Sequence, residues 1–213
     1  MRESQRIQRI IAILRHTYGN TMLGRLGQKY TPFQVLIATV LSARARDETI
    51  EIVAEGLFKK HPTPRLLARA PIAAIEKLIK KSGFFHVKAR RIKELARIIH
   101  EDYYDIVPDT MEGLVGLPGV GRKTAGCVLV YSHGKAAIPV DTHVHRISNR
   151  LGIVRTKTPE KTETALMKIV PEKDWHLVND LFVHHGKTVC KPIQPQCRKC
   201  TIKDLCTYPH KDK

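Results

Sequence analysis

The stretch LPGVGRKTA, residues 117–125, places a proline and two closely spaced glycines directly before two cations. Counted from Gly116, it nearly matches the spacing of the nucleotide-binding phosphate loop, G-x-x-x-x-G-K-[ST]. Arg122 occupies the position of the phosphate-loop lysine, and Lys123 follows one residue late. The glycines predict a tight turn that lets the backbone approach a ligand closely.

The residues before this turn indicate which fold it belongs to. A nucleotide phosphate loop follows a strand, whereas DTMEGLVG opens with a capping-box pattern, Asp109 with Glu112, and predicts a short helix. A second helix would begin after the turn and direct its positive dipole end toward an anion. Gly119, Val120 and Gly121 are therefore candidate contacts to a phosphate, and the chain's formal charge of +17 makes DNA the better candidate as its source. The alternative is a glycine-capped turn between two helices with no ligand.

The charge balance favours a nucleic acid as partner. The 213-residue chain carries 37 Lys and Arg against 20 Asp and Glu, a formal charge of +17, which attracts a polyanion. The alternative is a solvated basic surface without a specific partner. With 42% hydrophobic residues, the chain suffices for one or two globular domains. Its longest apolar run, around 35–41, is far shorter than the ~20 residues of a membrane span, so we expect no membrane partner.

Nearly the whole chain shows helical periodicity. Thr-Pro pairs at 31–32, 63–64 and 158–159 each precede a helical pattern, and a threonine N-cap followed by proline starts a helix well. Clear period-2 alternation is absent, so the sequence predicts an all-α protein. The expected helices cover residues 5–15, 32–43, 47–60, 64–70, 72–81, 86–104, 122–132, 143–150, 159–169 and 174–185.

Four of the five cysteines lie close together, with the spacing Cys190-x6-Cys197-x2-Cys200-x5-Cys206. This clustering indicates a metal site in a reducing compartment rather than a disulfide framework. The four thiolates suit a four-iron cluster or, as the alternative, a zinc ion. The fifth, Cys127, lies in an apolar run and is expected to be a buried structural residue.

Four motifs together resemble those of the endonuclease III family, which are helix-hairpin-helix DNA glycosylases with an iron–sulfur cluster. They are LPGVGRKTA, VDTH at 140–143, the cysteine spacing, and LSARARD at 41–47, which is similar to the family's LSAQATD segment. The resemblance extends over roughly residues 31 to 206.

This resemblance implies two α-helical domains with DNA bound in a cleft between them. A continuous six-helix domain with the helix-hairpin-helix would span 25–135, and a discontinuous helical domain with the iron–sulfur loop (190–206) would combine 1–24 with 136–213. The resemblance also implies a [4Fe–4S] cofactor, a monomeric protein, and double-stranded DNA with a damaged base or abasic site as partner. The expected location is the cytoplasm, in association with the nucleoid.

The resemblance assigns catalysis to Lys123 and Asp141. In the family's reaction the damaged base is flipped out of the duplex, the lysine attacks C1′ of its sugar, and the resulting Schiff base allows β-elimination that nicks the strand. A lysine suits a step that ends in an imine, and burial and the neighbouring Arg122 would favour loss of its proton. Asp141 precedes a helical run and is expected as an N-cap. Its carboxylate would stabilise charge as the base leaves or accept the proton of Lys123; the alternative is capping alone.

Further positions correspond to DNA contacts of the family. Phe84, in GFFHVKA, aligns with the residue that wedges into the base stack, and the alternative is a core phenylalanine. Arg44 stands where the family has the glutamine that fills the gap left by the flipped base, and it could donate hydrogen bonds to the orphaned base. The other expected DNA contacts are Arg122, His143, Lys187, Lys191, Arg198 and Lys199.

The expected function is therefore that of a bifunctional DNA glycosylase and abasic-site (AP) lyase of base excision repair, acting on oxidised pyrimidines. One alternative is a thymine/uracil–guanine mismatch glycosylase of the same superfamily. Relatives that remove adenine from mismatches lack a lysine at the position of Lys123, which argues against that activity. The other alternative is a DNA-binding module without catalysis.

Overall fold

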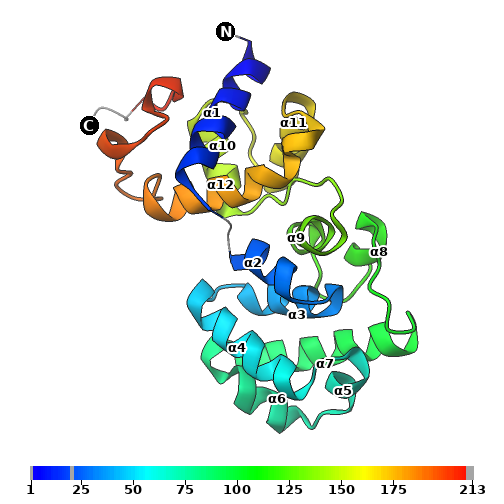
Figure 1. The fold of residues 1–213 in the computed structure, drawn as a ribbon. Coiled ribbons are helices and arrows are strands. Elements are labelled where there is room, and N and C mark those ends of the chain that lie inside the picture. The colour runs from blue at the N-terminus through cyan, green and yellow to red at the C-terminus, as the bar shows by residue number, and fades with distance from the viewer. Residues whose placement is uncertain (1, 20–21, 210–213) are drawn as a thin grey trace. The chain divides into compact units, whose positions relative to one another are not determined.

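A computed structural model describes residues 2–19 and 22–209 (Figure 1). Every regular element within these two ranges is helical, and neither range contains a strand, which confirms the all-α prediction. The chain forms two compact units. We call Met22–Lys135 the hairpin unit, and Met1–Thr21 with Ala136–Lys213 the cysteine unit. The boundaries expected from the sequence lay after residues 24 and 135.

The hairpin unit is built around one helix, α3, in which every residue from Phe33 to Leu41 is buried. A helix that is apolar on all sides needs neighbours on all sides, and α3 packs against α2, α4, α7 and α9. The described helices of this unit are α2 Met22–Lys29, α3 Pro32–Ser42, α4 Asp47–Lys60, α5 Pro64–Arg69, α6 Ile72–Ile79, the 3₁₀ turn η1 Lys80–Ser82, α7 Phe85–Glu101, α8 Met111–Val115 and α9 Arg122–His133. These are eight described α-helices where six were expected, and two of them, α5 and α8, have only six and five residues.

The cysteine unit gathers α10, α11 and α12 around the N-terminal helix α1 (Figure 1). Buried apolar residues of α1 and α12 form its centre, and Ile202 of the cysteine-rich segment joins them at 1% exposure. Arg6 of α1 donates from Nη1 to the carbonyl oxygens of Leu151 at 2.9 Å and Leu205 at 3.0 Å. The elements of this unit are α1 Glu3–Thr17, α10 Thr142–Arg150, α11 Pro159–Ile169, η2 Glu172–Asp174, α12 Trp175–Thr188, η3 Cys197–Lys199 and η4 Lys203–Leu205.

The three Thr-Pro pairs start helices as predicted. Thr31, Thr63 and Thr158 are the N-caps of α3, α5 and α11, and each threonine Oγ1 accepts a hydrogen bond from the third backbone N–H of its helix. The predicted bounds of two helices, 47–60 and 159–169, agree with those of α4 and α11. These local signals therefore determine where the chain enters its helices.

Helix α2 was not predicted from the sequence, because glycine disfavours a helix interior and this helix contains Gly24 and Gly27. The structure supplies the reason for the second glycine. A Cβ atom at Gly27 would lie 2.3 Å from the carbonyl oxygen of Tyr131, so α2 approaches α9 more closely than any side chain would permit. Tertiary packing outweighs the low helix propensity here.

The capping prediction for α8 was wrong by one residue. The N-cap is Thr110, whose Oγ1 accepts from the backbone N–H of Gly113 at 3.2 Å. Asp109 instead pairs with Nζ of Lys135 at 2.6 Å, which holds the second residue after α9 close to the start of α8. None of the described helices is long and apolar enough to cross a membrane.

Candidate active site and cysteine loop

The turn between α8 and α9 has the tight geometry that its glycines predict. The backbone N–H of Leu117 donates to Leu114 and that of Val120 donates to Leu117, both at 3.1 Å. Gly119 has φ +75°, in the left-handed region that glycine adopts without strain. Gly121 is the N-cap of α9, which begins without a side-chain capping bond. Such a helix start offers backbone donors and a positive dipole end to an anion.

Arg91 of α7 lies directly against this turn. A Cβ at Gly119 would be 2.6 Å from Nε of Arg91, and the arginine is itself exposed. A cation therefore stands beside the backbone that would approach a phosphate. Nothing in the sequence links Arg91 to the turn, because the two are brought together only by the packing of the unit.

Lys123 is the second residue of α9, directly after the exposed Arg122. It is half-buried, and the following residues from Ala125 to Leu129 are buried. Cys127, at 0% exposure, is the buried structural cysteine that was predicted. The core side of α9 thus fixes the backbone of Lys123 at the end of the helix that would face a phosphate.

Asp141 is the N-cap of α10, as predicted. Its Oδ1 accepts from the backbone N–H groups of His143 at 2.8 Å and Val144 at 2.9 Å. Both capping bonds go to one oxygen, and Oδ2 has no hydrogen-bond donor among the residues that the structure describes. Capping therefore leaves one carboxylate oxygen for other chemistry. Asp141 belongs to the cysteine unit and Lys123 to the hairpin unit.

His143 is half-buried in the first turn of α10. Burial lowers the pKa of this histidine, although the charge of Asp141 acts in the opposite direction. Its Nδ1 lies 3.2 Å from Nη2 of Arg146, which is consistent with an unprotonated nitrogen that accepts a hydrogen bond. A neutral ring would contact DNA as a hydrogen-bonding group rather than as a cation.

Arg44 and Phe84, which are far apart in sequence, lie together in the hairpin unit. The guanidinium carbon of Arg44 is 5.9 Å from the centre of the Phe84 ring, a cation–π distance. Phe84 is 65% exposed, so the structure contradicts the alternative of a core phenylalanine.

The backbone at both positions is in an unfavourable conformation. Arg44 has φ +54° and Phe84 has φ +48°, and neither is glycine. A bulky residue in the left-handed region is uncommon and costs on the order of 1–3 kcal/mol. Such strain persists only where the surrounding structure holds it, and it is common at ligand-binding sites. The two loop tips are therefore held in defined positions.

The four clustered cysteines are free of disulfides and line one cavity. The cavity is otherwise walled by residues of α10, α12 and the cysteine-rich segment, including Ile147, His185 and Tyr208. Within the described residues, no group of three or more His, Cys, Asp or Glu side chains is arranged to hold a single metal ion. The four thiols line a cavity and do not converge on one position.

Hydrogen-bond donors lie against two of the sulfur atoms. Nη1 of Arg150 is 3.5 Å from Sγ of Cys190, and the backbone N–H of Tyr208 is 3.4 Å from Sγ of Cys206. Donors of this kind stabilise thiolates and tune a bound metal centre.

A third sulfur meets a buried histidine. Nε2 of His185 lies 3.6 Å from Sγ of Cys200, and Nδ1 of the same ring lies 3.1 Å from the hydroxyl of Tyr18. Burial lowers the pKa of His185 to about 4, so the ring is neutral. Burial raises the pKa of Cys200 to about 11, so this thiol ionises at neutral pH only when a metal replaces its proton.

Comparison with known proteins places these features in a family. A model of HhH-GPD superfamily base excision DNA repair proteins matches residues 37–172. Endonuclease III of Thermotoga maritima is 51% identical over 83% of both chains. The chain belongs to the endonuclease III family. A structure of a non-covalent endonuclease III–DNA complex has a TM-score of 0.88 at 35% identity and covers 97% of this chain and 96% of its own. A trapped endonuclease III–DNA covalent intermediate, an estranged-adenine complex, has a TM-score of 0.86 at 34% identity, with 97% of both chains covered.

In this member of the endonuclease III family, two arginines of α10 clamp the cysteine-rich segment. Nη2 of Arg146 donates to the carbonyl oxygen of Cys190 at 2.9 Å. Arg150 donates to the carbonyls of Lys191 at 2.6 Å and Pro192 at 2.7 Å. Their i, i+4 spacing places both arginines on one face of the helix that Asp141 caps. The spacing of the two arginines can be read from the sequence, but the carbonyl groups that they bind cannot.

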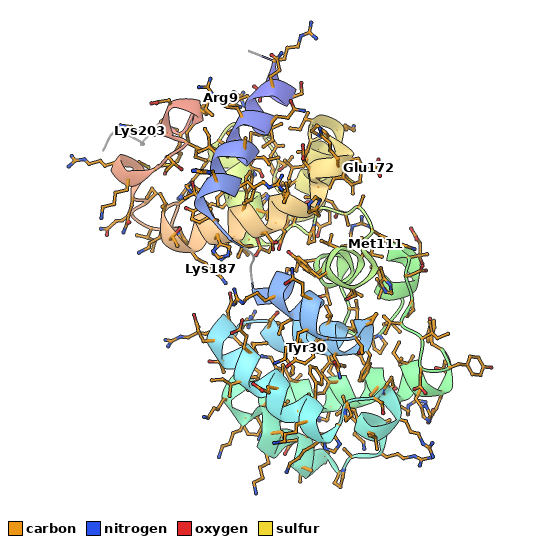
Figure 2. The ribbon with its side chains drawn as sticks, in the orientation of Figure 1. Arg9, Tyr30, Met111, Glu172, Lys187 and Lys203 are labelled. Carbon is orange, nitrogen blue, oxygen red and sulfur yellow. The ribbon has the colours of Figure 1, made fainter. Side chains whose placement is uncertain are left out.

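The expected cations of the cysteine unit are all on its surface. Lys187, in the last turn of α12, is exposed and points away from the ribbon (Figure 2). Lys191 is exposed directly after Cys190. Arg198 and Lys199, which lie between the two central cysteines, are also exposed and belong to η3. The cysteine-rich segment of this endonuclease III family member therefore presents cations to solvent.

Proposed function

We propose that this chain, a DNA glycosylase and AP lyase of the endonuclease III family, removes oxidised pyrimidines from duplex DNA through a Schiff base on Lys123. The observation that carries the proposal is the position of Lys123 as the second residue of a helix that begins without a side-chain capping bond, directly behind a glycine turn. That position sets an amine beside a backbone suited to holding a phosphate, so the amine would lie close to the sugar of the same strand.

The reaction follows from the chemistry of an amine. Nζ of Lys123, once it has lost a proton, attacks C1′ of the damaged nucleotide, and the bond from C1′ to the base breaks. The free oxygen of Asp141 supports the positive charge that develops on the sugar as the base leaves. The sugar ring then opens at its C1′–O4′ bond, O4′ takes up the remaining proton of Nζ, and C1′ and Nζ are left joined as an imine. The imine acidifies the neighbouring C2′ position, and loss of a C2′ proton expels the 3′ phosphate by β-elimination, which nicks the strand.

DNA would be held by the hairpin backbone and by surface cations. Gly119, Val120 and Gly121 grip a phosphate through the backbone, without reading sequence, while Arg122 and Arg91 add charge beside them. Lys187, Lys191, Arg198 and Lys199 are the corresponding cations of the cysteine unit. Phe84 and Arg44 would enter the stack where the damaged base leaves, which offsets the cost of flipping it out.

The four clustered cysteines are proposed to hold a [4Fe–4S] cluster. The four thiols line one cavity, and hydrogen-bond donors lie against two of the sulfur atoms, which supports a cluster. When bound, the cluster would supply cross-links that fix residues 190–206 and their cations in place.

Anaerobically purified protein is expected to contain about four iron and four sulfide per chain. Cys200→Ser should lose most of this iron, because one of four ligands is removed. Cys127→Ser is the matched control, since Cys127 is buried in the other unit and should keep the full iron content. Elemental analysis with sulfide determination decides the question, and one zinc per chain without iron would contradict the proposal.

A single-turnover assay tests the substrate class. Duplexes that carry thymine glycol are compared with duplexes that carry a T·G or U·G mismatch. We expect base removal from the oxidised pyrimidine to be at least about tenfold faster, and each removal to be followed by a nick. Faster excision from the mismatches would establish the mismatch glycosylase instead. Binding without base removal on any duplex would establish the non-catalytic module.

A further inference from the structure

Lys88 of α7 is a buried cation whose two partners are backbone carbonyls. It is 5% exposed, and its Nζ donates to the carbonyl oxygens of Leu41 at 2.8 Å and Ser82 at 2.7 Å. Burial lowers the pKa of this lysine, and no carboxylate of the described residues offsets that effect. A buried ammonium without an ion pair is unfavourable. The presence of a lysine at this buried position, bound to two backbone carbonyls, therefore calls for an explanation other than stability.

The two carbonyls belong to the bases of the two strained loops. Leu41 lies in the last turn of α3, three residues before Arg44, and Ser82 ends η1, two residues before Phe84. The tips of these loops, Arg44 and Phe84, meet through their cation–π contact. The loops are thus joined twice, once at their exposed tips and once at their buried bases by a single ammonium group.

We propose that Lys88 is a positioning residue that fixes Arg44 and Phe84 as one rigid element for insertion into damaged DNA. This inference rests on the proposed function. An inserted wedge works only if its parts keep their spacing against the force of a stacked duplex, and small displacements of positioned groups cost large factors in rate. The terminal carbonyls of α3 attract a cation through the helix dipole, and Lys88 uses this attraction to tie that helix end to the Phe84 loop.

Lys93 provides an internal comparison on the same helix. Its Nζ donates to the carbonyl of Ala68 at 2.8 Å and also to that of Ala70, so it makes the same kind of double bond to backbone. It ties α7 to the end of α5, and none of the residues proposed to contact DNA lies in that segment. A lysine that serves stability alone is expected to behave like Lys93.

The test compares Lys88→Met with Lys93→Met in single-turnover excision of thymine glycol and in binding to undamaged duplex, at a temperature where both variants are folded by circular dichroism. Lys88→Met should slow excision about 10- to 100-fold and leave binding to undamaged duplex within about twofold, because the hairpin is untouched. Lys93→Met should change neither quantity by more than about twofold. In a Phe84→Ala background, Lys88→Met should add less than its full loss, because Phe84 is then absent and only the position of Arg44 still depends on Lys88.

Excision by Lys88→Met within about twofold of wild type would overturn the inference. Three further results would also overturn it. One is equal slowing by Lys93→Met, and another is a full multiplication of the Lys88→Met and Phe84→Ala effects. The third is normal excision by Phe84→Ala, which would also remove the wedge from the proposed function. Borohydride trapping through Lys123 would be unaffected by that result, so the proposed Schiff-base chemistry would remain supported. If Lys88→Met does not fold, Lys88→Gln replaces it. Its shorter amide cannot reach both carbonyls, and excision within about twofold of wild type would also overturn the inference.

Discussion

Replacing Lys123 by alanine is expected to abolish the adduct that borohydride traps between the protein and DNA with an abasic site. Borohydride reduces an imine to a stable amine, so trapping requires the amine that formed the Schiff base. Alanine has no such group, and strand nicking by β-elimination should fall by about 10³-fold or more. Binding to the same DNA should change little, because the hairpin backbone keeps its turn. A denaturing gel that resolves protein–DNA adducts measures the effect.

Lys135→Ala is the matched control for this experiment. Lys135 is an exposed lysine just after the same helix, and its partner is Asp109 rather than any residue proposed to act on DNA. This variant should trap DNA as well as wild type. If Lys123→Ala trapped DNA equally well, a different amine would be the nucleophile.

Asp141→Asn is expected to slow base removal by about 10²- to 10³-fold and to leave the affinity for DNA nearly unchanged. Asparagine retains a side-chain oxygen that can cap α10 through the N–H groups of His143 and Val144. The charge, however, is lost from the oxygen that takes no part in capping. Single-turnover excision of thymine glycol measures the chemical step, and binding to a non-cleavable abasic analogue measures affinity.

A second N-cap of the cysteine unit separates capping from catalysis. Thr158→Ala removes the cap of α11 and should lower the free energy of unfolding by about 1 kcal/mol without changing the excision rate. Asp141→Asn should show the opposite pattern, with a slow reaction and nearly normal stability. An unchanged excision rate in Asp141→Asn would mean that this residue is a cap and nothing more.

Helix starts could be predicted from the sequence because their signals are local. A threonine followed by a proline fixes the first turn through one side chain and one φ angle, and all three such pairs start helices. Helix α2 could not be predicted, because its formation depends on the close approach of Gly27 to Tyr131, a residue far along the chain. Helix propensity depends on neighbouring residues and contains no information about such a contact.

The same distinction applies to the candidate site. The cap at Asp141 and the turn before Lys123 follow from neighbouring residues, and the structure has both. The pairing of Arg44 with Phe84 joins two separate loops, and their link through Lys88 comes from a third element. The sequence identified the two tips by their resemblance to a family, but only the folded unit shows that one buried cation lies beneath both.

The contact of Arg6 with Leu205 joins two residues that a ribosome synthesises at very different times. Helix α1 is synthesised well before one of the carbonyls that its arginine binds, because Arg6 and Leu205 lie 199 residues apart. At about 5–20 residues per second, roughly 10 to 40 s separate the two. The hairpin unit, Met22–Lys135, is continuous in sequence and is complete well before then. The apolar face of α1 stays exposed until the helices that cover it have been synthesised. This face includes Ile7, Ile10 and Leu14. Helix α1 is thus buried only after the helices that follow the hairpin unit have been made, and chaperones can bind its apolar face in that interval.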